Sequence, residues 1–197
     1  MTLPPEYFED VYTANEDPWD FATSPYEAAK YARTLAALPR ESYHRALEVG
    51  CSIGVLTGQL AGRADELLAL DINEQALARA RARNADRPNI HFQQGQLPDR
   101  LPDGPPFDLI VLSEVLYYLS PADLDRALDA VLARLEPQGT LMLVHWTPFV
   151  PDYPQTGDAV HTAALARVGR GLEHLHAERH GDEQQGYRLD VFVRTED

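Results

Sequence analysis

The sequence predicts an α/β fold built on a doubly wound, mostly parallel sheet of seven strands, with an antiparallel strand near the C-terminus. Short apolar runs alternate with amphipathic stretches between residues 25 and 146, an order typical of parallel strands joined by crossover helices. The run at 107–112 is apolar except for Asp108, which indicates a strand buried on both faces. Residues 187–194 instead alternate apolar and polar side chains, so we expect a half-exposed antiparallel strand there.

The chain has the length and composition of one folded domain. It contains 197 residues, of which 44% are hydrophobic and 24% are charged, a balance typical of globular proteins and not of disordered ones. We therefore expect a single domain over residues 1–197. Pro18 and Pro25 interrupt any regular element near the N-terminus, so we expect residues 1–24 to form a lid segment.

Helix-start residues and turns define the first predicted elements. A helix over 25–38 begins at Pro25 behind Ser24, because proline is favoured at the first helical position. Strand 46–49 runs into a glycine-containing turn, and a helix follows from residue 55. Strand 67–71 precedes Asn73, which is expected to cap a helix over 73–85. Residues 90–93 form the third strand.

The second half of the chain continues the same alternation. Strand 107–112 ends at Ser113, and Ser120 followed by Pro121 predicts the start of the next helix. Gly139 is expected to end that helix before strand 140–146. A loop with prolines and a short helix over 158–168 then precede the last strands.

The net charge limits the classes of partner. The chain carries 31 Asp and Glu against 17 Lys and Arg, a formal charge of −14, which repels phosphate backbones and anionic lipid headgroups. We therefore expect neither nucleic acid nor a membrane as a partner, and a small-molecule substrate instead. The oligomeric state stays open.

Cysteine and histidine usage limits compartment and metal content. A single cysteine, Cys51, cannot form an internal disulfide, and the sequence has neither a leader nor an apolar run long enough to cross a bilayer. We therefore expect a cytoplasmic protein. His174, His176 and His180 do not match a known metal-ligand spacing, so we expect no metal.

The first predicted strand ends in a turn suited to a ligand. Gly50 and Gly54 lie in this turn, where a missing Cβ permits tight bending and close approach of a ligand. Ser52 stands where the dinucleotide motif G-x-G-x-x-G has its second glycine, which argues against NAD and FAD. Asp71 ends the next strand about twenty residues later, where a carboxylate can accept the hydroxyls of a ribose. Together these residues predict a nucleoside site, although either piece alone is also common in structural turns.

The order of these motifs resembles class I S-adenosylmethionine-dependent methyltransferases. The resemblance covers residues 44–146 and is carried by E-V-G-C-S-I-G, L-D-I, F-D-L-I-V-L-S-E-V-L-Y-Y-L and L-x-P-x-G-x-L. A narrower resemblance to the nodulation protein S (NodS) family is carried by D-P-W-D-F-x-x-S-x-Y-E-x-x-K at 17–30, S-E-V-L-Y-Y-L at 113–119 and H-W…Y-P…G-D…V-H at 145–161. That family N-methylates the free amino group of chitin-type oligosaccharides. The resemblance therefore implies S-adenosylmethionine as cofactor and an amino sugar as acceptor.

The resemblance also implies which residues bind the cofactor. Gly50 and Gly54 are expected beside its methionine part, Asp71 on the ribose, and Glu48 on the methionine ammonium. Gln96 stands where many relatives have an aspartate that holds the adenine amine, and its side-chain carbonyl can accept the same hydrogen bond. The other residues expected in this site are Ile72, Leu97 and Ser113.

Trp19 and Lys30 lie in or beside the expected lid segment. Trp19 is expected to pack over the sulfonium or the substrate, and Lys30 to meet the cofactor carboxylate. A core tryptophan and a surface lysine are the structural alternatives.

Methyl transfer to an amine requires an unprotonated nucleophile in line with the methyl group, so a nearby proton acceptor is useful. The expected catalytic residues are Glu114 and Tyr117, which follow strand 107–112, and His161 as the base. The residues expected to bind the substrate at the same sheet edge are Tyr118, His145, Trp146 and Asp158. The structural alternative is that the tyrosines pack inward and the histidines are only hydrogen-bonded.

Three functions stay open at this point. The first is N-methylation of an amino sugar or another small amine, and the second is O-methylation of a small metabolite by the same fold and cofactor. The third is a regulatory protein that binds the cofactor without turnover. The His, Glu and Tyr side chains at the expected rim favour turnover.

Overall fold

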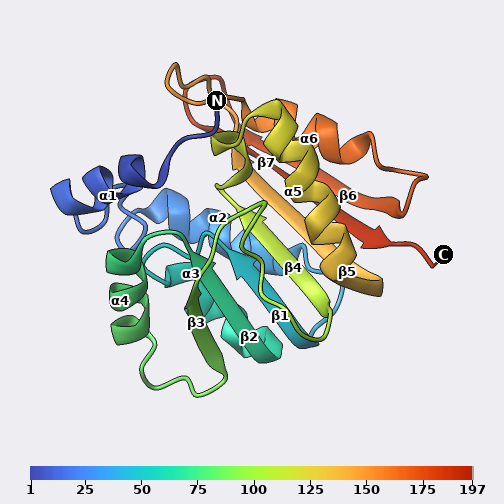
Figure 1. The fold of residues 1–197 in the computed structure, drawn as a ribbon, viewed down its shortest axis with the longest axis horizontal. Helices are drawn as coiled ribbons and strands as arrows, with labels where there is room; N and C mark the ends of the chain where they lie inside the picture. Colours follow the sequence, from blue (N-terminus) through green and yellow to red (C-terminus); the bar gives the residue numbers. More distant parts are fainter. Residues whose placement is uncertain (197) are drawn as a thin grey trace.

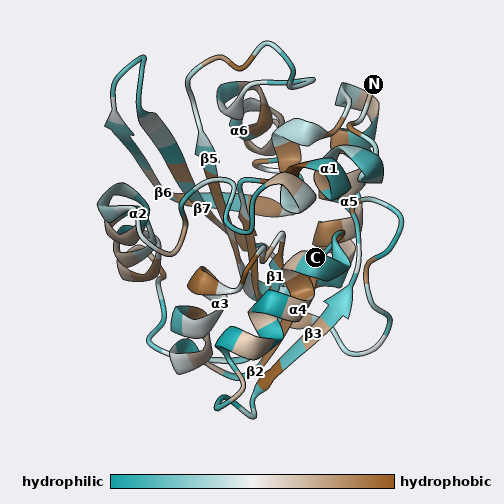
Figure 2. Cartoon of the chain, turned by 90° about the vertical axis from the view of Figure 1, so that its left-hand side faces the viewer, coloured by the Kyte–Doolittle hydropathy of each residue, from teal (hydrophilic) through white to brown (hydrophobic). Residues whose placement is uncertain are grey.

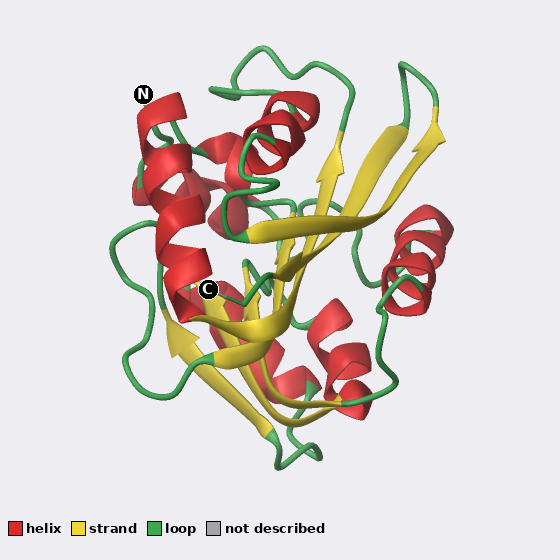
Figure 3. Cartoon of the chain, turned by 90° about the vertical axis from the view of Figure 1, so that its right-hand side faces the viewer, coloured by secondary structure: helices red, strands yellow, loops and turns green. Residues whose placement is uncertain are grey.

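The computed structural model describes residues 1–196, which form one seven-stranded sheet with helices on both faces (Figures 1 and 3). The strands are β1 Tyr43–Val49, β2 Ala64–Asp71, β3 Ile90–Gln94, β4 Phe107–Ser113, β5 Leu135–Trp146, β6 Leu172–Gly181 and β7 Gly186–Arg194. The helices are α1 Pro5–Ala14, α2 Pro25–Ala36, α3 Val55–Leu60, α4 Glu74–Arg83, α5 Pro121–Arg134 and α6 Gly157–Leu165. Two short 3-10 turns, η1 Ala61–Arg63 and η2 Leu116–Tyr118, complete the elements.

The strand order is β3-β2-β1-β4-β5-β7-β6. Strands β1 to β5 pair in parallel, whereas β7 pairs antiparallel with both β5 and β6. This topology confirms the predicted mostly parallel sheet with an antiparallel C-terminal end. The order reverses between β1 and β4, and in open α/β sheets ligands bind at the carboxyl ends of the strands beside such a reversal.

The sheet separates two apolar clusters. Side chains of α5 and α6 pack on one face, and side chains of α2 and α3 pack on the other. The strands at the centre of the molecule are hydrophobic, whereas α4 is largely hydrophilic apart from its buried Ala76, Leu77 and Ala80 (Figure 2). Within residues 1–196, no helix combines the length and apolar composition needed to cross a membrane.

The predicted helix starts are confirmed by side-chain caps. Ser24 accepts a hydrogen bond from Glu27 N at 3.4 Å, and Asn73 accepts one from Ala76 N at 3.0 Å. Ser120 accepts one from Asp123 N at 3.3 Å. Each cap satisfies an amide that the first helical turn leaves without a partner.

The N-terminal segment contains a helix that the prolines were expected to prevent. Pro18 lies beyond the end of α1, and Pro5 occupies its first turn, where proline is tolerated. Phe8 and Tyr12 on α1 are buried in the core. The segment therefore packs as a folded element over the carboxyl edge of the sheet.

Two other expectations are wrong in detail. Gly139 does not end α5, because the helix stops at Arg134 and Gly139 lies inside β5, where the pairing with β4 is irregular. Strand β7 is not half exposed. It lies between β5 and β6, so its polar Asp190 is as buried as the apolar Leu189.

Candidate active site

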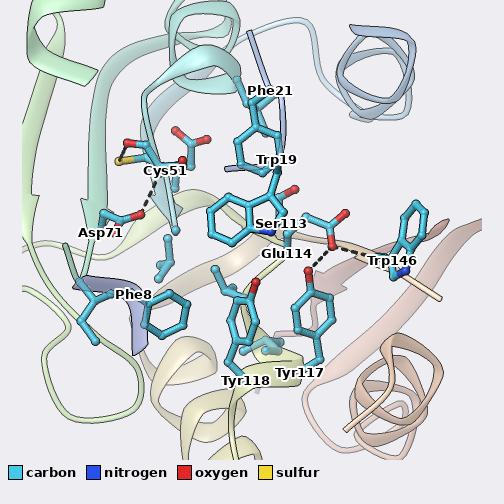
Figure 4. Close-up of a pocket in the computed structure, with 18 of the residues that line it drawn as sticks. Phe8, Trp19, Phe21, Cys51, Asp71, Ser113, Glu114, Tyr117, Tyr118 and Trp146 are labelled. Carbon is cyan, nitrogen blue, oxygen red and sulfur yellow. Dashed lines mark hydrogen bonds between the residues drawn. The ribbon is translucent and has the colours of Figure 1, made fainter. Parts of the chain in front are cut away.

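A cavity of about 480 Å³ opens at the carboxyl ends of the parallel strands, between the sheet and the N-terminal segment (Figure 4). The sequence-predicted residues that line it are Trp19, Lys30, Glu48, Gly50, Asp71, Ile72, Gln96, Leu97, Ser113, Glu114, Tyr117, Tyr118 and Trp146. The predicted residues that do not line it are Gly54, His145, Asp158 and His161. The structure thus brings most of the expected cofactor residues together and moves two histidines elsewhere.

The turn after β1 forms one wall of the cavity. Gly50 has a φ of 81°, and the amides of Gly50 and Cys51 donate to Leu70 O at 2.8 and 2.9 Å. A Cβ at Gly50 would lie 2.0 Å from Val115 Cγ1. Glycine is therefore required here both by its backbone conformation and by the close approach of the β4 turn.

We predict that Gly50→Ala lowers the free energy of unfolding by about 2 kcal/mol or more, because a left-handed alanine is strained and its methyl group overlaps Val115. Urea denaturation measures this change. Gly62→Ala is the control, since a Cβ at Gly62 meets no atom within 4 Å, and it should shift the same quantity by no more than about 0.5 kcal/mol. Equal effects of the two substitutions would contradict the packing role of Gly50.

Gly54 serves the turn in another way than expected. Its φ is 77°, and a Cβ there would lie 2.7 Å from Asn84 Nδ2 and 2.9 Å from Ala80 Cβ. Asn84 Nδ2 donates to Gly54 O at 2.9 Å. Gly54 thus allows the start of α3 to pack against α4, and it does not line the cavity in which it was expected beside the methionine part of the cofactor.

Asp71 ends β2 at the floor of the cavity and is 6% exposed. Its carboxylate accepts hydrogen bonds from Ser52 N at 2.8 Å and Asn73 N at 2.9 Å. These amides fix the carboxylate while each oxygen keeps a further lone pair for a ligand. Burial raises the pKa of Asp71 to about 6. The Tyr12 hydroxyl, from α1, donates to Ser52 Oγ at 2.6 Å and ties the N-terminal segment to this turn.

Glu48 is a buried carboxylate with an unpaired oxygen. It is 2% exposed and lines the cavity, and its Oε2 has no hydrogen-bond partner within 3.5 Å, although the Thr57 side chain lies near enough to favour the charged carboxyl. Burial raises the pKa of Glu48 to about 7. A buried acceptor without a partner is costly, so this atom is suited to a ligand that brings a donor, such as an ammonium group.

The turn after β3 supplies further residues that line the cavity. Leu97 is buried and Gln96 is half-buried. The backbone N–H of Gln96 donates to Arg100 O at 3.4 Å, so its side chain is not used by this bond. Ile72 lines the same part of the cavity from the end of β2. The side-chain amide of Gln96, together with the apolar side chains of Ile72 and Leu97, can hold a flat heterocycle.

Lys30 is a buried side chain and not the surface lysine of the structural alternative. It is 2% exposed, and its Nζ lies 2.9 Å from Glu27 Oε2 and 2.7 Å from Glu114 Oε1. Although burial opposes its charge, the two carboxylates raise the pKa of Lys30. We refer to Glu27, Lys30 and Glu114 as the buried ion triad. It neutralises the ammonium group, which weakens the expectation that Lys30 holds the cofactor carboxylate.

Glu114 organises the side of the cavity next to β4 and β5. Its backbone φ is 58°, and its Oε2 accepts from the Tyr117 hydroxyl at 2.7 Å and from Trp146 N at 2.8 Å (Figure 4). Its other oxygen binds Lys30. Burial raises the pKa of Tyr117 well above its usual range. Since the Tyr117 proton is directed at Glu114, the phenolic oxygen has lone pairs left for a donor in the cavity.

Aromatic rings cover the remaining walls. Tyr117 stacks on Tyr153 with 5.0 Å between the ring centroids, and the hydroxyl oxygens of Tyr118 and Tyr153 lie 3.4 Å apart. Trp19 stacks on Phe21 at 5.5 Å. These ring faces suit a ligand with apolar CH surface.

His161 is not at the rim, so its assignment as the base is corrected. It is 0% exposed and contacts His145 and Asp190. His145 is equally buried, and Asp158 lies outside the cavity beside Arg179 and Arg188. The expected three-residue spacing of Asp158 and His161 is helical, but α6 turns His161 into the core and Asp158 away from the cavity.

Sequence reasoning did not identify Glu27, Tyr12 and Tyr153 as residues of this site. Glu27 had a local signal, because it precedes Lys30 by one helical turn. Tyr12 and Tyr153 had none, since each reaches the cavity from an irregular or unexpected segment.

Comparisons with known proteins agree with this architecture. The family model for nodulation protein S (NodS) matches residues 9–146. Nodulation protein S of Bradyrhizobium diazoefficiens is 35% identical over 131 residues, which are 66% of this chain and 62% of that protein. The chain thus spans about three fifths of the length of this relative.

Solved structures show the same fold. The N-methyltransferase NodS from Bradyrhizobium japonicum WM9, in complex with S-adenosyl-L-homocysteine, matches with a TM-score of 0.85 and 24% identity, over 97% of this chain and 98% of that one. A putative methyltransferase from Pseudomonas syringae is 40% identical with a TM-score of 0.73, over 86% of this chain and 99% of that one. The described residues therefore form a class I methyltransferase fold, and the chain belongs to the nodulation protein S family.

Proposed function

We propose that this chain is an S-adenosylmethionine-dependent N-methyltransferase whose acceptor is a free amine on an amino sugar or a similar small molecule. The observation that carries this proposal is the charge of the cavity wall. Among the described residues that line it, the acids are Asp20, Glu27, Glu48, Asp71 and Glu114, and the base is Lys30. Lys30 is already matched by two carboxylates, so the cavity favours cations over anions.

The residues at the carboxyl ends of β1 to β3 fit the cofactor. Asp71 offers lone pairs to the ribose hydroxyls, and the unpaired Oε2 of Glu48 would accept from the methionine ammonium. Ile72, Gln96 and Leu97 would enclose the adenine. When bound there, S-adenosylmethionine supplies an electrophilic methyl group on a sulfonium. Its net positive charge matches the acidic wall.

The β4 side of the cavity fits an amine acceptor. The Tyr117 oxygen can accept from an amine N–H, because its own proton is donated to Glu114. This contact orients the nitrogen lone pair, and the Tyr117–Glu114 pair can draw the proton that an ammonium must lose before it becomes a nucleophile. An acceptor bearing a carboxylate or phosphate has no unmatched cation on the described cavity wall to bind it.

The aromatic faces favour a saccharide as the carrier of that amine. Tyr117, Tyr153 and Trp146 present ring surface to the cavity region, and the CH-rich face of a sugar stacks on such rings while its hydroxyls bind polar groups. Trp19 closes the opposite side.

The test uses labelled S-adenosylmethionine with matched deacetylated and acetylated chitooligosaccharides. We expect label only in the compounds with a free amine, because an amide nitrogen shares its lone pair with the carbonyl and is a poor nucleophile. Equal labelling of both compounds would overturn the amine assignment. So would labelling of neither, with methylation of a phenol or a carboxylate instead.

The raised pKa of Glu48 makes a prediction about cofactor binding. We expect the affinity for S-adenosylhomocysteine to increase from about pH 6 to about pH 8, because the free carboxyl, with a pKa raised to about 7 by burial, must lose its proton to bind the ligand ammonium. Calorimetry in buffers of different ionisation enthalpy should detect the released proton.

Glu48→Gln is the matched control for this prediction, since it keeps the shape and cannot ionise. It should bind more weakly and release no proton near pH 7. The role of Glu48 would be refuted if this variant and the unmodified protein released the same number of protons.

A further inference from the structure

A row of buried polar side chains runs behind the aromatic wall of the cavity. It consists of His145 on β5, His161 on α6 and Asp190 on β7, each 0% exposed. His145 Nε2 accepts from Leu116 N at 3.3 Å, and His145 Nδ1 lies 3.1 Å from His161 Nε2. His161 Nδ1 lies 2.5 Å from Asp190 Oδ2. None of the proposed steps of methyl transfer uses these groups.

The two ends of this row determine where its protons are. Leu116 N–H can only donate, so His145 Nε2 must be unprotonated and the proton of a neutral His145 must be on Nδ1. That proton points at His161 Nε2, so the proton of His161 must in turn be on Nδ1, where the Asp190 carboxylate accepts it. All hydrogen bonds therefore run in one direction, from the backbone amide to the carboxylate.

The element at the donor end carries the proposed acceptor contact. Leu116 opens η2, which spans Leu116–Tyr118, and the ring of Tyr117 packs edge-on against the His145 ring at 5.4 Å. The Tyr117 hydroxyl lies 2.7 Å from Glu114 Oε2, and a shift of this turn would move it away from that oxygen.

We infer that His145, His161 and Asp190 are positioning residues, which hold η2 and thereby place the Tyr117 hydroxyl for the acceptor. The part of this inference that concerns the acceptor rests on the proposed function, whereas the direction of the hydrogen bonds does not.

The charges around the row keep both rings neutral. Burial, His161 and Lys30 lower the pKa of His145, and burial lowers the pKa of His161 despite Asp190. Arg188 Nε binds Asp190 Oδ2 at 2.6 Å, and the charges of Arg188 and Asp158 act on the pKa of His161 in opposite directions.

His174 also contacts this row, because its Nε2 lies 2.6 Å from Oδ1 of Asp190. A second proton on His145 would set its Nε2–H against Leu116 N–H. A second proton on His161 would set its Nε2–H against His145 Nδ1–H, and His145 relieves this by moving its proton to Nε2, which also removes the acceptor of Leu116 N–H. Both lowered pKa values place this event on the acid side of the ordinary histidine range. The hold on η2 is thus present at neutral pH and lost on acidification.

Two substitutions at one position separate the hydrogen bond from the packing. In His145→Gln, the amide oxygen can take the place of Nε2 and accept from Leu116 N–H. In His145→Asn, the shorter amide reaches only the place of Nδ1, so Leu116 N–H stays without a partner.

We expect His145→Asn to lower kcat/KM for the amine about tenfold, because a buried Leu116 N–H without a partner disfavours the conformation that places Tyr117 by about 1.4 kcal/mol. Its affinity for S-adenosylhomocysteine should stay unchanged, and the Leu116 amide should exchange with solvent faster. His145→Gln should keep the activity and the slow exchange of Leu116. Equal behaviour of the two variants in amide exchange would overturn the inference.

The unmodified protein provides a readout that depends on neither folding of a variant nor an acceptor. Nitrogen-15 NMR of labelled histidines should show both buried rings protonated on Nδ1 and not on Nε2 at neutral pH, which is the opposite of the form that free histidine prefers. Protonation of Nε2 on either ring at neutral pH would refute the directed row even if the amine is methylated. Confirmed tautomers with no methylation of any amine would instead refute the proposed function alone.

Discussion

Tyr117→Phe is expected to lower kcat/KM for the amine acceptor by about 100-fold or more, the usual range for loss of a group that handles a proton. The substitution removes the oxygen that accepts from the amine and leaves the ring, which still stacks on Tyr153. Glu114 keeps its contacts with Lys30 and Trp146 N, so the cavity should keep its shape. Initial rates with labelled S-adenosylmethionine measure the effect.

Tyr153→Phe is the matched control for that experiment. It removes a hydroxyl from the ring that stacks on Tyr117, but that hydroxyl contacts other tyrosine hydroxyls, Tyr118 at 3.4 Å and Tyr7, and not Glu114. We expect a change of less than about tenfold in kcat/KM, the size of one ordinary hydrogen bond. Affinity for S-adenosylhomocysteine should be unchanged in both variants. Near-normal activity of Tyr117→Phe would show that another group receives the amine.

Local sequence patterns predicted several of the residues that line the cavity at the ends of β1 and β2. The glycine turn and Asp71 each depend on residues within a few positions of a strand end, and parallel strands bring such ends to one edge. The helix caps at Ser24, Asn73 and Ser120 are also local, because the capping contact spans three residues. These features needed no knowledge of distant contacts.

The acceptor half could not be predicted in the same way. His161 was expected to be a base because its spacing from Asp158 puts both on one side of a helix, but the spacing does not say whether that side meets solvent or core. Its partner Asp190 lies 29 positions further along the chain. Asp190 is one of the polar residues that predicted a half-exposed antiparallel strand, whereas β7 lies between β5 and β6 and contacts α6.

Lys30 shows the same limit for a charged residue. The helical spacing from Glu27 is visible in the sequence, but an i,i+3 pair is most often a solvated surface contact worth little. Its burial depends on Glu114, which is 84 positions away and held by the turn after β4. Only the folded chain shows that the three charges form a closed triad.

Lys30→Met is expected to lower the free energy of unfolding by about 3–5 kcal/mol, because it leaves two largely buried carboxylates without their shared cation. Methionine has a similar length and fills the space, so the effect reports on charge more than on volume. Chemical denaturation at neutral pH measures the change. Arg81→Met is the control, since its ion pair with Glu74 is exposed, and it should change the same quantity by less than about 1 kcal/mol.

Acidification separates the loss of charge pairing from any loss of packing in Lys30→Met. Burial already raises the pKa of Glu27 despite Lys30, and removal of the cation must raise it further. A carboxyl whose pKa is higher in the folded than in the unfolded state binds more protons when folded, so stability increases as the pH falls toward the unfolded value. The deficit of Lys30→Met should therefore shrink between neutral pH and about pH 5, within the range where such carboxyls take up protons. A deficit that is the same at both pH values would mean that Lys30 stabilises the fold through its hydrocarbon chain. The triad would then no longer explain why the described residues of the cavity wall offer no free cation to an anionic acceptor.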